Sequence, residues 1–455
     1  MHLRPTARGV ALLLAGVVLL VVGALLGADD VVQVGTVALL VVAAAVVVSA
    51  LRDPGRGRAR IEVARSTRPA TPTAGEPATV RTLVRTPYDA TGSVLVGARL
   101  HEGADEELKG GRPLAIRAAR VPFGAALTST VHPVRRGVWE LGPLTVTRTD
   151  VFGVVRVRRA VGGVTAVRVW PRTVPLAAPR DTLPAEPERA ALGALSPAAD
   201  DAALRDYREG DDLRRVHWRT SARLGELVVR TDERSGTRPA TVLLDVPVDD
   251  DALEWAIVLG CSMGLALLDA GHPVRLVVAE PDDGSAPGAA GRRDRRDAHG
   301  GRERAGAHGP AGSGAVRAAY AHPATGPEAR AAVLDACVDV APAVAEATAR
   351  DALGRALRAL AVVAPERELV LAVLGPLPER HRSAPDEDAG LGLDLARLAA
   401  SAEGWAVVRH APTPEDSARA DLTVESLGRA GWRAVAARVG EPVERTWDRL
   451  LTEAR

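Results

Sequence analysis

The chain has 455 residues, of which 47% are hydrophobic and 25% are charged, and its 58 Lys and Arg residues balance 57 Asp and Glu residues. This balance excludes the basic footprint of a nucleic-acid-binding protein, and two cysteines exclude a disulfide scaffold or a Cys-rich zinc site. The single lysine, Lys109, is followed by Gly110, which excludes a Walker A phosphate loop. The length allows about three domains.

Two apolar blocks, residues 10–28 and 31–51, follow the N-terminus and are separated only by Asp29 and Asp30. Each is long enough to cross a hydrocarbon core of about 30 Å. A signal peptide and a buried soluble hairpin are the alternatives, but the second block follows at once and no cleavage site precedes the polar turn. The positive-inside rule predicts a protein of the cell membrane with two spans and both termini cytoplasmic. The flanking arginines are Arg4, Arg8, Arg52, Arg56, Arg58 and Arg60.

Short alternating apolar runs, punctuated by Pro and Gly, follow the apolar blocks. They predict an antiparallel β-sandwich over residues 52–175, with Val94–Leu100, Leu144–Val146 and Val167–Val169 as examples. Residues 136–143 predict a strand that ends in a tight turn at Gly142-Pro143. Residues 176–200, rich in Pro and Ala, predict a linker.

The spacing of apolar residues changes after the linker, and it predicts strands that alternate with helices over residues 201–455. This alternation predicts a mostly parallel sheet covered on both faces, so the whole chain is a multidomain protein. Residues 281–315 lack periodicity and predict a disordered insertion. The expected strands are residues 241–245, 274–279, 369–374, 405–409 and 432–439, and the expected helices are residues 253–268, 391–402 and 421–429.

Arginines crowd the segment between residues 204 and 230. Gly210 allows a sharp turn, and Asp211 or the next aspartate can cap a short helix that begins near Leu213. On that helix Arg215 and Arg223 lie on one cationic face, which requires acids or an anion opposite. Two interpretations follow: an internal ion-pair network, or a contact with a partner or an anion.

The spacing Arg-x-Tyr-x-x-Gly-Asp-x-x-Arg-Arg-Val-His-Trp-x-x-Ser-Ala-Arg resembles the signature of the bacterial family called domain of unknown function 58. Residues 136–143, 150–153 and 169–171 also resemble the upstream strands of that family. The matching positions are Arg205, Tyr207, Gly210, Asp211, Arg214, Arg215, Trp218, Ser221, Ala222 and Arg223.

This resemblance implies two N-terminal spans, a β-sandwich and a domain like the von Willebrand factor A domain. It also implies genes that accompany MoxR-type AAA+ ATPases, and often transglutaminase-like membrane proteins. The family has no established activity, so the resemblance implies a context and no reaction.

A degenerate metal site is one candidate function. An intact A domain places Asp-x-Ser-x-Ser after its first strand, and these oxygens hold Mg²⁺. The matching stretch here runs from Asp245 to Asp249 and has Pro247 and no serine. Asp245 and Asp249 are the candidate cation ligands, and the alternative is an acidic strand end beside a capped helix. We expect no cofactor.

Gly260-Cys261-Ser262-Met263-Gly264 fits the nucleophile-elbow pattern of serine hydrolases. The same residues, however, form a continuous helical stripe on which Cys261 is a core residue. The candidate oxyanion glycines, beside His299, lie downstream instead of upstream, and Asp394 with His410 is a guess for the other triad members.

We therefore expect a membrane-anchored, non-catalytic adaptor whose A-like domain engages a protein partner. The lipid bilayer is one partner, and the resemblance makes a MoxR-type ATPase the other. The sequence identifies no small-molecule substrate and no nucleic-acid contact. The rival is a cryptic enzyme, either a hydrolase that uses Ser262 or a metal-dependent activity at Asp245 and Asp249.

Overall fold

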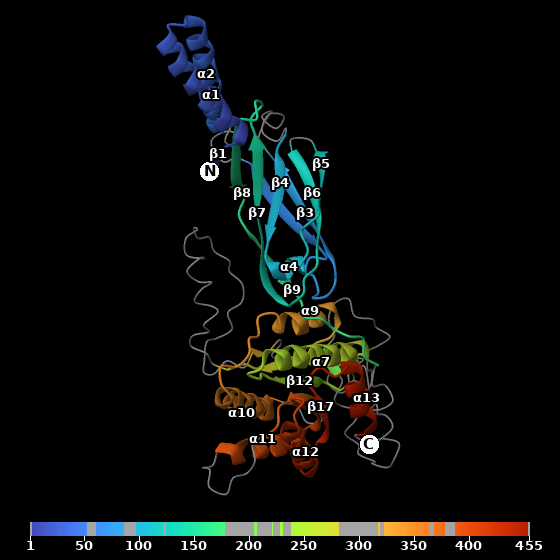
Figure 1. Ribbon diagram of the computed structural model, residues 1–455. Coiled ribbons are helices and arrows are strands. Elements are labelled where there is room, and N and C mark those ends of the chain that lie inside the picture. The colour runs from blue at the N-terminus through green and yellow to red at the C-terminus, as the bar shows by residue number, and fades with distance from the viewer. Residues whose placement is uncertain are drawn as a thin grey trace. The chain divides into compact units, whose positions relative to one another are not determined.

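The computed structural model describes residues 2–51, 61–85, 97–121, 124–177, 204–206, 221, 228–230, 238–281, 317–318, 323–363, 368–377 and 387–453. The chain divides into two compact units, Met1–Arg172 and Thr173–Arg455 (Figure 1). The predicted linker, residues 176–200, and the predicted insertion, residues 281–315, lie almost wholly outside the described residues.

Two apolar helices, α1 (Ala7–Leu26) and α2 (Asp29–Leu51), open the first unit. Both are long and apolar enough to cross a membrane, with mean hydropathies of 2.9 and 2.7, which confirms two candidate spans. Asp29 and Asp30 lie in the first turn of α2, where the positive end of the helix favours acids. A third helix, α7 (Asp250–Asp269), also has this length and hydropathy, but it is 78% buried and is a core helix.

Glycines bring α1 and α2 together. Gly16 and Gly23 of α1 are buried against α2, whereas Gly9, the third buried residue of α1, lies against Val154. A Cβ atom on Gly35 of α2 would lie 2.9 Å from the carbonyl oxygen of Gly16. Small residues allow helices in a membrane to approach closely. Most of the remaining apolar surface of the hairpin is therefore exposed to its surroundings.

Two antiparallel sheets complete the first unit. One has the order β2 (Glu62–Arg68), β3 (Ala78–Arg85), β6 (Gly124–Val131) and β5 (Ile116–Val121). The other has the order β1 (His2–Pro5), β8 (Val155–Val161), β7 (Gly137–Thr149) and β4 (Arg99–Ala104), and β9 (Thr165–Val169) also pairs with β7. We call residues 61–172 the β region. Its buried clusters combine side chains of both sheets, such as Val84 and Leu144, which is consistent with the predicted sandwich.

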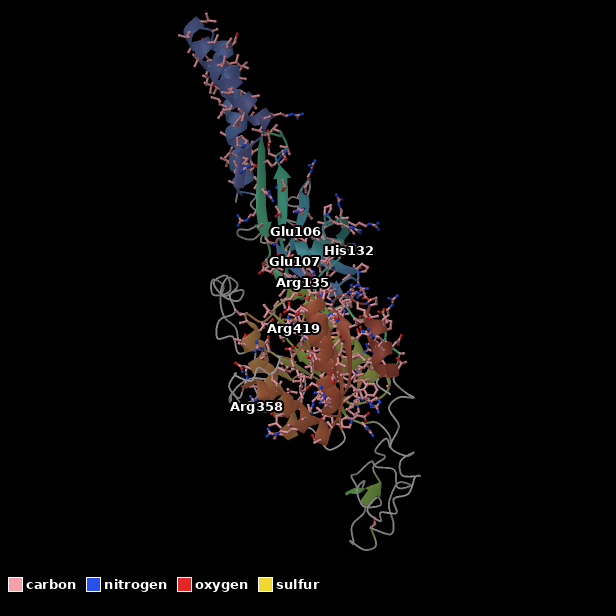
Figure 2. The ribbon with its side chains drawn as sticks, turned by 60° about the horizontal axis from the view of Figure 1, so that its bottom comes forward. Glu106, Glu107, His132, Arg135, Arg358 and Arg419 are labelled. Atoms are coloured by element: carbon pink, nitrogen blue, oxygen red, sulfur yellow. The ribbon has the colours of Figure 1, made fainter. Side chains whose placement is uncertain are left out.

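A short helix, α4 (Glu106–Lys109), closes one end of the β region (Figures 1 and 2). The backbone nitrogen of His132 donates to the carbonyl oxygen of Leu108 at 2.8 Å, and that of Val134 donates to Glu107 at 2.9 Å. The helix is thus tied to the end of β6.

Two features of the β region differ from the sequence prediction. The predicted turn at Gly142-Pro143 is wrong, because β7 continues through it to Thr149. A register shift in the facing strand, between Glu102 and Ala104, absorbs the irregularity as a bulge. The second feature is β1, which was not predicted and pairs antiparallel with β8.

The second unit, here called the α/β unit, contains the predicted parallel sheet. Its strand order is β14 (Arg317–Ala318), β13 (Val274–Ala279), β12 (Ala240–Asp245), β15 (Leu369–Leu374), β16 (Glu403–His410) and β17 (Arg433–Arg438). All neighbours are parallel except the edge strand β14. Every residue of β12, β13 and β15 is buried, as expected for a sheet covered on both faces.

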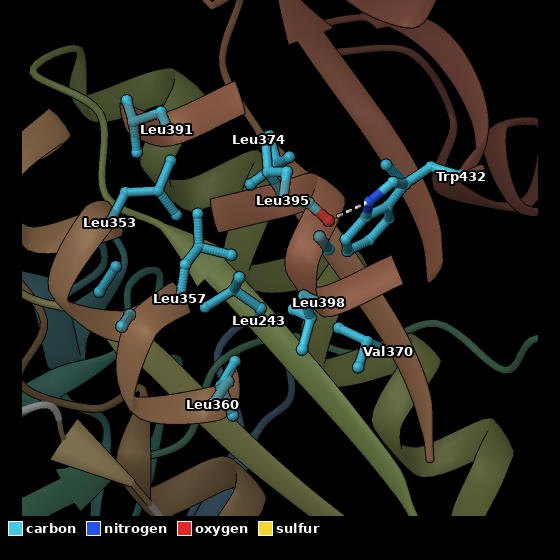
Figure 3. Close-up of a cluster of buried hydrophobic side chains, with 14 of the residues drawn as sticks. Leu243, Leu353, Leu357, Leu360, Val370, Leu374, Leu391, Leu395, Leu398 and Trp432 are labelled. Atoms are coloured by element: carbon cyan, nitrogen blue, oxygen red, sulfur yellow. Dashed lines mark hydrogen bonds between the residues drawn. The ribbon is translucent and has the colours of Figure 1, made fainter. Parts of the chain in front are cut away.

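Helices cover both faces of this sheet (Figure 1). The helix α7 packs with α9 (Gly326–Ala336) and α13 (Val443–Glu453). On the other face lie α10 (Glu346–Val363), α11 (Glu387–Ser401) and α12 (Pro414–Arg429). Figure 3 shows the apolar cluster under these three helices, where Nε1 of Trp432 donates to the carbonyl oxygen of Leu395 at 2.9 Å.

Candidate functional site

A cleft of about 1080 Å³ lies at the carboxyl ends of β12, β15 and β16. The chain leaves β12 toward α7 on one face of the sheet and leaves β15 toward α11 on the other. Open α/β sheets bind their ligands at such a switch point, outside the carboxyl ends of the strands. We call this cavity the switch-point cleft and treat it as the candidate site.

A buried ion pair forms the floor of the cleft. Oδ2 of Asp245, at the end of β12, accepts hydrogen bonds from Nη1 and Nη2 of Arg409, each at 3.0 Å. The backbone nitrogen of Gly375, which follows β15, donates to the same oxygen at 3.0 Å. The side chains of Asp245 and Arg409 are only 11% and 7% exposed. The guanidinium therefore neutralises the carboxylate from within the protein.

The second candidate cation ligand, Asp249, also has a structural role. It is the N-cap of α7, and its Oδ1 accepts from the backbone nitrogen of Ala252 at 2.8 Å. Among the described residues, no group of three or more His, Cys, Asp or Glu side chains is placed to hold a metal ion. The geometry fits the alternative interpretation, an acidic strand end beside a capped helix.

The rim of the cleft carries both signs of charge. The N-terminal ends of α7, α10 and α12 meet here, and the lining includes five carboxylates and three guanidinium groups. On α12, Arg419 (Figure 2) pairs with Asp416 and, at 4.0 Å, with Glu415. Val248, which is 42% exposed, adds an apolar contact. The cleft is wide, and its lining combines charges of both signs with apolar side chains.

Ser262 does not lie in a nucleophile elbow. It is 1% exposed in the middle of the continuous helix α7, whereas an elbow requires a sharp strand-to-helix turn. Its Oγ donates to the carbonyl oxygen of Val258 at 2.6 Å and accepts from the backbone nitrogen of Val174 at 2.9 Å. The elbow interpretation of this segment is wrong, and the hydroxyl fixes the backbone at residue 174 against α7.

The two residues proposed beside Ser262 have separate partners. Asp394 on α11 is 5% exposed and accepts from Nη1 of Arg358 at 3.1 Å (Figure 2). Nδ1 of His410 lies 2.8 Å from the backbone carbonyl oxygen of Ala411. His299 lies outside the described residues. The structure therefore brings together no hydrolase triad from the predicted residues.

Most of the arginine-rich motif lies outside the described residues. Arg205 is in β10 (Leu204–Asp206), opposite Val229 of β11 (Val228–Arg230), and Ser221 is 7% exposed. Both interpretations of the cationic face remain predictions. The motif residues outside the described part are Tyr207, Gly210, Asp211, Arg214, Arg215, Trp218, Ala222 and Arg223.

A second buried charge network, not predicted, lies at the amino ends of the strands. Nη2 of Arg275 donates to Oε2 of Glu368 at 2.8 Å, and Nε of Arg275 donates to Oγ1 of Thr241 at 2.6 Å. The Thr241 hydroxyl donates to the other oxygen of Glu368. Burial raises the pKa of Glu368 above 4.5, although the bonds from Thr241 and the charge of Arg275 act in the opposite direction.

We expect Glu368→Gln to change the pH dependence of stability. Between pH 4.5 and the raised pKa of Glu368, the folded state binds more protons than the unfolded state, so the free energy of unfolding falls as pH rises. Glutamine does not titrate, so the Gln variant lacks this pH-dependent contribution to the free energy of unfolding. The unfolding free energy of the wild type minus that of the variant, from urea titrations in detergent micelles, should therefore fall with pH across this window. A difference that is constant or rises with pH would contradict the raised pKa.

Comparison with known proteins gives one family match. Residues 203–252 match the family described as "Protein of unknown function DUF58". No curated protein matches the chain in sequence. Two solved structures of the PilB minor pilin from Streptococcus sanguinis, a point mutant and the unmutated protein, are 9% and 8% identical. The alignments cover 88% and 82% of this chain and 88% and 84% of the pilin chains, with TM-scores of 0.30, too low to inform the fold. The matched residues, 203–252, hold the whole arginine-rich motif on which the resemblance to this family depends.

Proposed function

We propose that this chain is a membrane-anchored, non-catalytic adaptor whose α/β unit binds a protein partner through the switch-point cleft. The observation that carries the proposal is the mixed-charge rim around an internally neutralised carboxylate. The ion pair of Asp245 and Arg409 satisfies the group that would otherwise hold a cation. What remains for a ligand is a broad surface that combines charged side chains with apolar ones such as Val248.

The size of the cleft favours a protein partner over a small molecule. Its volume of about 1080 Å³ is above the usual range of small-molecule sites, about 300–1000 Å³. Rim charges such as Arg419, which is 43% exposed, set the specificity and rate of protein association.

The α/β unit has, in our proposal, a fold like the von Willebrand factor A domain. The first long strand, β12, is central, and the chain adds β13 on one side before it returns to β15 on the other. In an A domain the metal-holding aspartate follows the first strand, and Asp245 has this place in the present chain. Arg409 supplies the positive charge there.

The membrane hairpin gives the proposed location. Both candidate spans precede the β region, and Arg4 and Arg8 lie before and at the start of α1, while residues 52–60 after α2 carry four more arginines. The positive-inside rule places these ends, and with them the β region and the α/β unit, in the cytoplasm.

The partner we propose is a MoxR-type AAA+ ATPase, because the family resemblance associates such ATPases with DUF58 proteins. We expect a pull-down of the full chain from native membranes to recover this ATPase. Arg419→Glu should abolish recovery, because the reversed charge lies on the rim of the cleft. The measurement is the amount of ATPase recovered per chain, with and without nucleotide.

Arg429→Glu is the matched control. Arg429 lies at the other end of α12 and pairs with Glu425 four residues before it, as Arg419 does with Glu415. Both substitutions reverse the charge of an exposed arginine that pairs with acids on α12, Arg419 with two and Arg429 with one, but Arg429 does not line the cleft. Equal recovery with both variants would reject the cleft as the docking site, and no ATPase with the wild type would reject the partner.

A further inference from the structure

Three arginines gather on one face of the sheet that contains β1. Arg4 of β1 lies directly opposite Arg156 of β8, and Arg158 follows two residues along the same face. These side chains line a cavity of about 770 Å³ together with His101, Thr145 and Thr147. We call these six residues the arginine face.

The arginine face contains no acid. All of its arginines are exposed, and no carboxylate is among the residues that line its cavity. Within the described part of the chain, Arg4, Arg156 and Arg158 form no ion pair. Like charges directly opposite each other in a sheet destabilise it, so this face is arranged to receive an anion.

The arginine face lies beside the start of the first membrane helix. Arg4 is three residues before Ala7, where α1 begins, so its backbone is about 10 Å from the helix at about 3.3 Å per residue. The start of β8 packs on the hairpin, because Val155 and Val157 cluster with Ala45 of α2. The Thr6 hydroxyl, which caps α1, donates to the carbonyl oxygen of Gly153. The end of the sheet is therefore fixed against the spans.

The turn between β7 and β8 carries apolar side chains at the same end. Val151 and Phe152 are 87% and 59% exposed, and the Asp150 carboxylate fixes their loop through bonds from the backbone nitrogens of Phe152 and Val155. A mostly apolar cavity of about 260 Å³ separates this turn from Ala44–Ser49 of α2. Exposed apolar residues beside a membrane helix indicate that this turn meets the bilayer.

From these observations we propose that the arginine face binds the headgroups of anionic phospholipids, with Val151 and Phe152 inserted among the acyl chains. Anionic lipids concentrate in the cytoplasmic leaflet, and each arginine held near that surface strengthens binding about fivefold. The inference rests on the proposed membrane span of α1 and α2, but it does not depend on the partner of the α/β unit.

The test measures lipid retained by the full chain. The chain is extracted in detergent, incubated with phosphatidylglycerol or phosphatidylcholine, and examined by native mass spectrometry. We expect the wild type to retain phosphatidylglycerol in preference to phosphatidylcholine. Removal of two charges in Arg156→Gln/Arg158→Gln should weaken this retention about 25-fold, and Arg156→Lys/Arg158→Lys should restore it.

Two controls make the result specific. Arg112→Gln/Arg117→Gln removes two arginines that line a different cavity, that beside α4, and should leave retention unchanged. Excess inorganic phosphate should not displace the lipid, since displacement would identify a free-anion site and overturn the lipid assignment. Equal retention of the two lipids, or unchanged retention after Arg156→Gln/Arg158→Gln, would also overturn the proposal. These outcomes are independent of the ATPase pull-down, so the two proposals fail separately.

Discussion

Arg409→Met should destabilise the α/β unit by about 3–5 kcal/mol. The Asp245 side chain is 11% exposed, and among the described residues the substitution leaves it only the backbone nitrogen of Gly375 as a hydrogen-bond donor. An unpaired buried charge costs more than the pair contributes, because its desolvation is no longer offset. Methionine fills part of the volume of the arginine stem without its charge. The measurement is urea unfolding of the full chain in micelles, followed by tryptophan fluorescence.

The double variant Asp245→Asn/Arg409→Met separates charge from packing. If the loss arises from the stranded carboxylate, neutral asparagine should restore much of the stability, and the two substitutions will be strongly non-additive. If the double variant is as unstable as, or less stable than, Arg409→Met alone, then the loss comes from packing around β16 and not from the buried charge.

The elements of the parallel sheet could be predicted because their signals are local. The strand at residues 369–374 is an unbroken apolar run, and the observed β15 has the same bounds. Three helices were missed although each has a local signal. The helix α13, for example, places Val443, Trp447 and Leu450 on one face at helical spacing, and all three are buried. The high Ala and Arg content of α10 obscured a similar stripe.

The candidate site could be predicted only in part, because it depends on strand order. Asp245 and Arg409 both end predicted strands, so their meeting at one edge of the sheet follows from parallel pairing. Their separation of 164 residues, however, gives no local signal that β12 and β16 flank the same strand. The four-residue strand β1 is too short for an alternating pattern, so the arginine face was also hidden.

The second large loss of stability is expected from the apolar cluster around Trp432. Trp432→Ala should cost about 3–5 kcal/mol, the usual range for a large aromatic side chain removed from a core. The ring is 3% exposed among α11, α12 and the sheet, and its Nε1 donates to the carbonyl oxygen of Leu395 at 2.9 Å (Figure 3). The loss has two sources, the cavity and the unpaired carbonyl. The free energy of unfolding of the α/β unit measures the sum of these two contributions.

Gly404 tests how tightly this ring is held. A Cβ atom on Gly404 of β16 would lie 2.4 Å from Cδ2 of Trp432, so the indole must move in Gly404→Ala. We expect a loss of about 1–3 kcal/mol from such overpacking. In the Trp432→Ala background the ring is absent, and the added methyl group meets open space. Gly404→Ala should then cost almost nothing or recover some stability, so that the double variant is no less stable than Trp432→Ala alone. Additive losses would show that Gly404 is required for the backbone of β16 itself, and not for the contact with the indole.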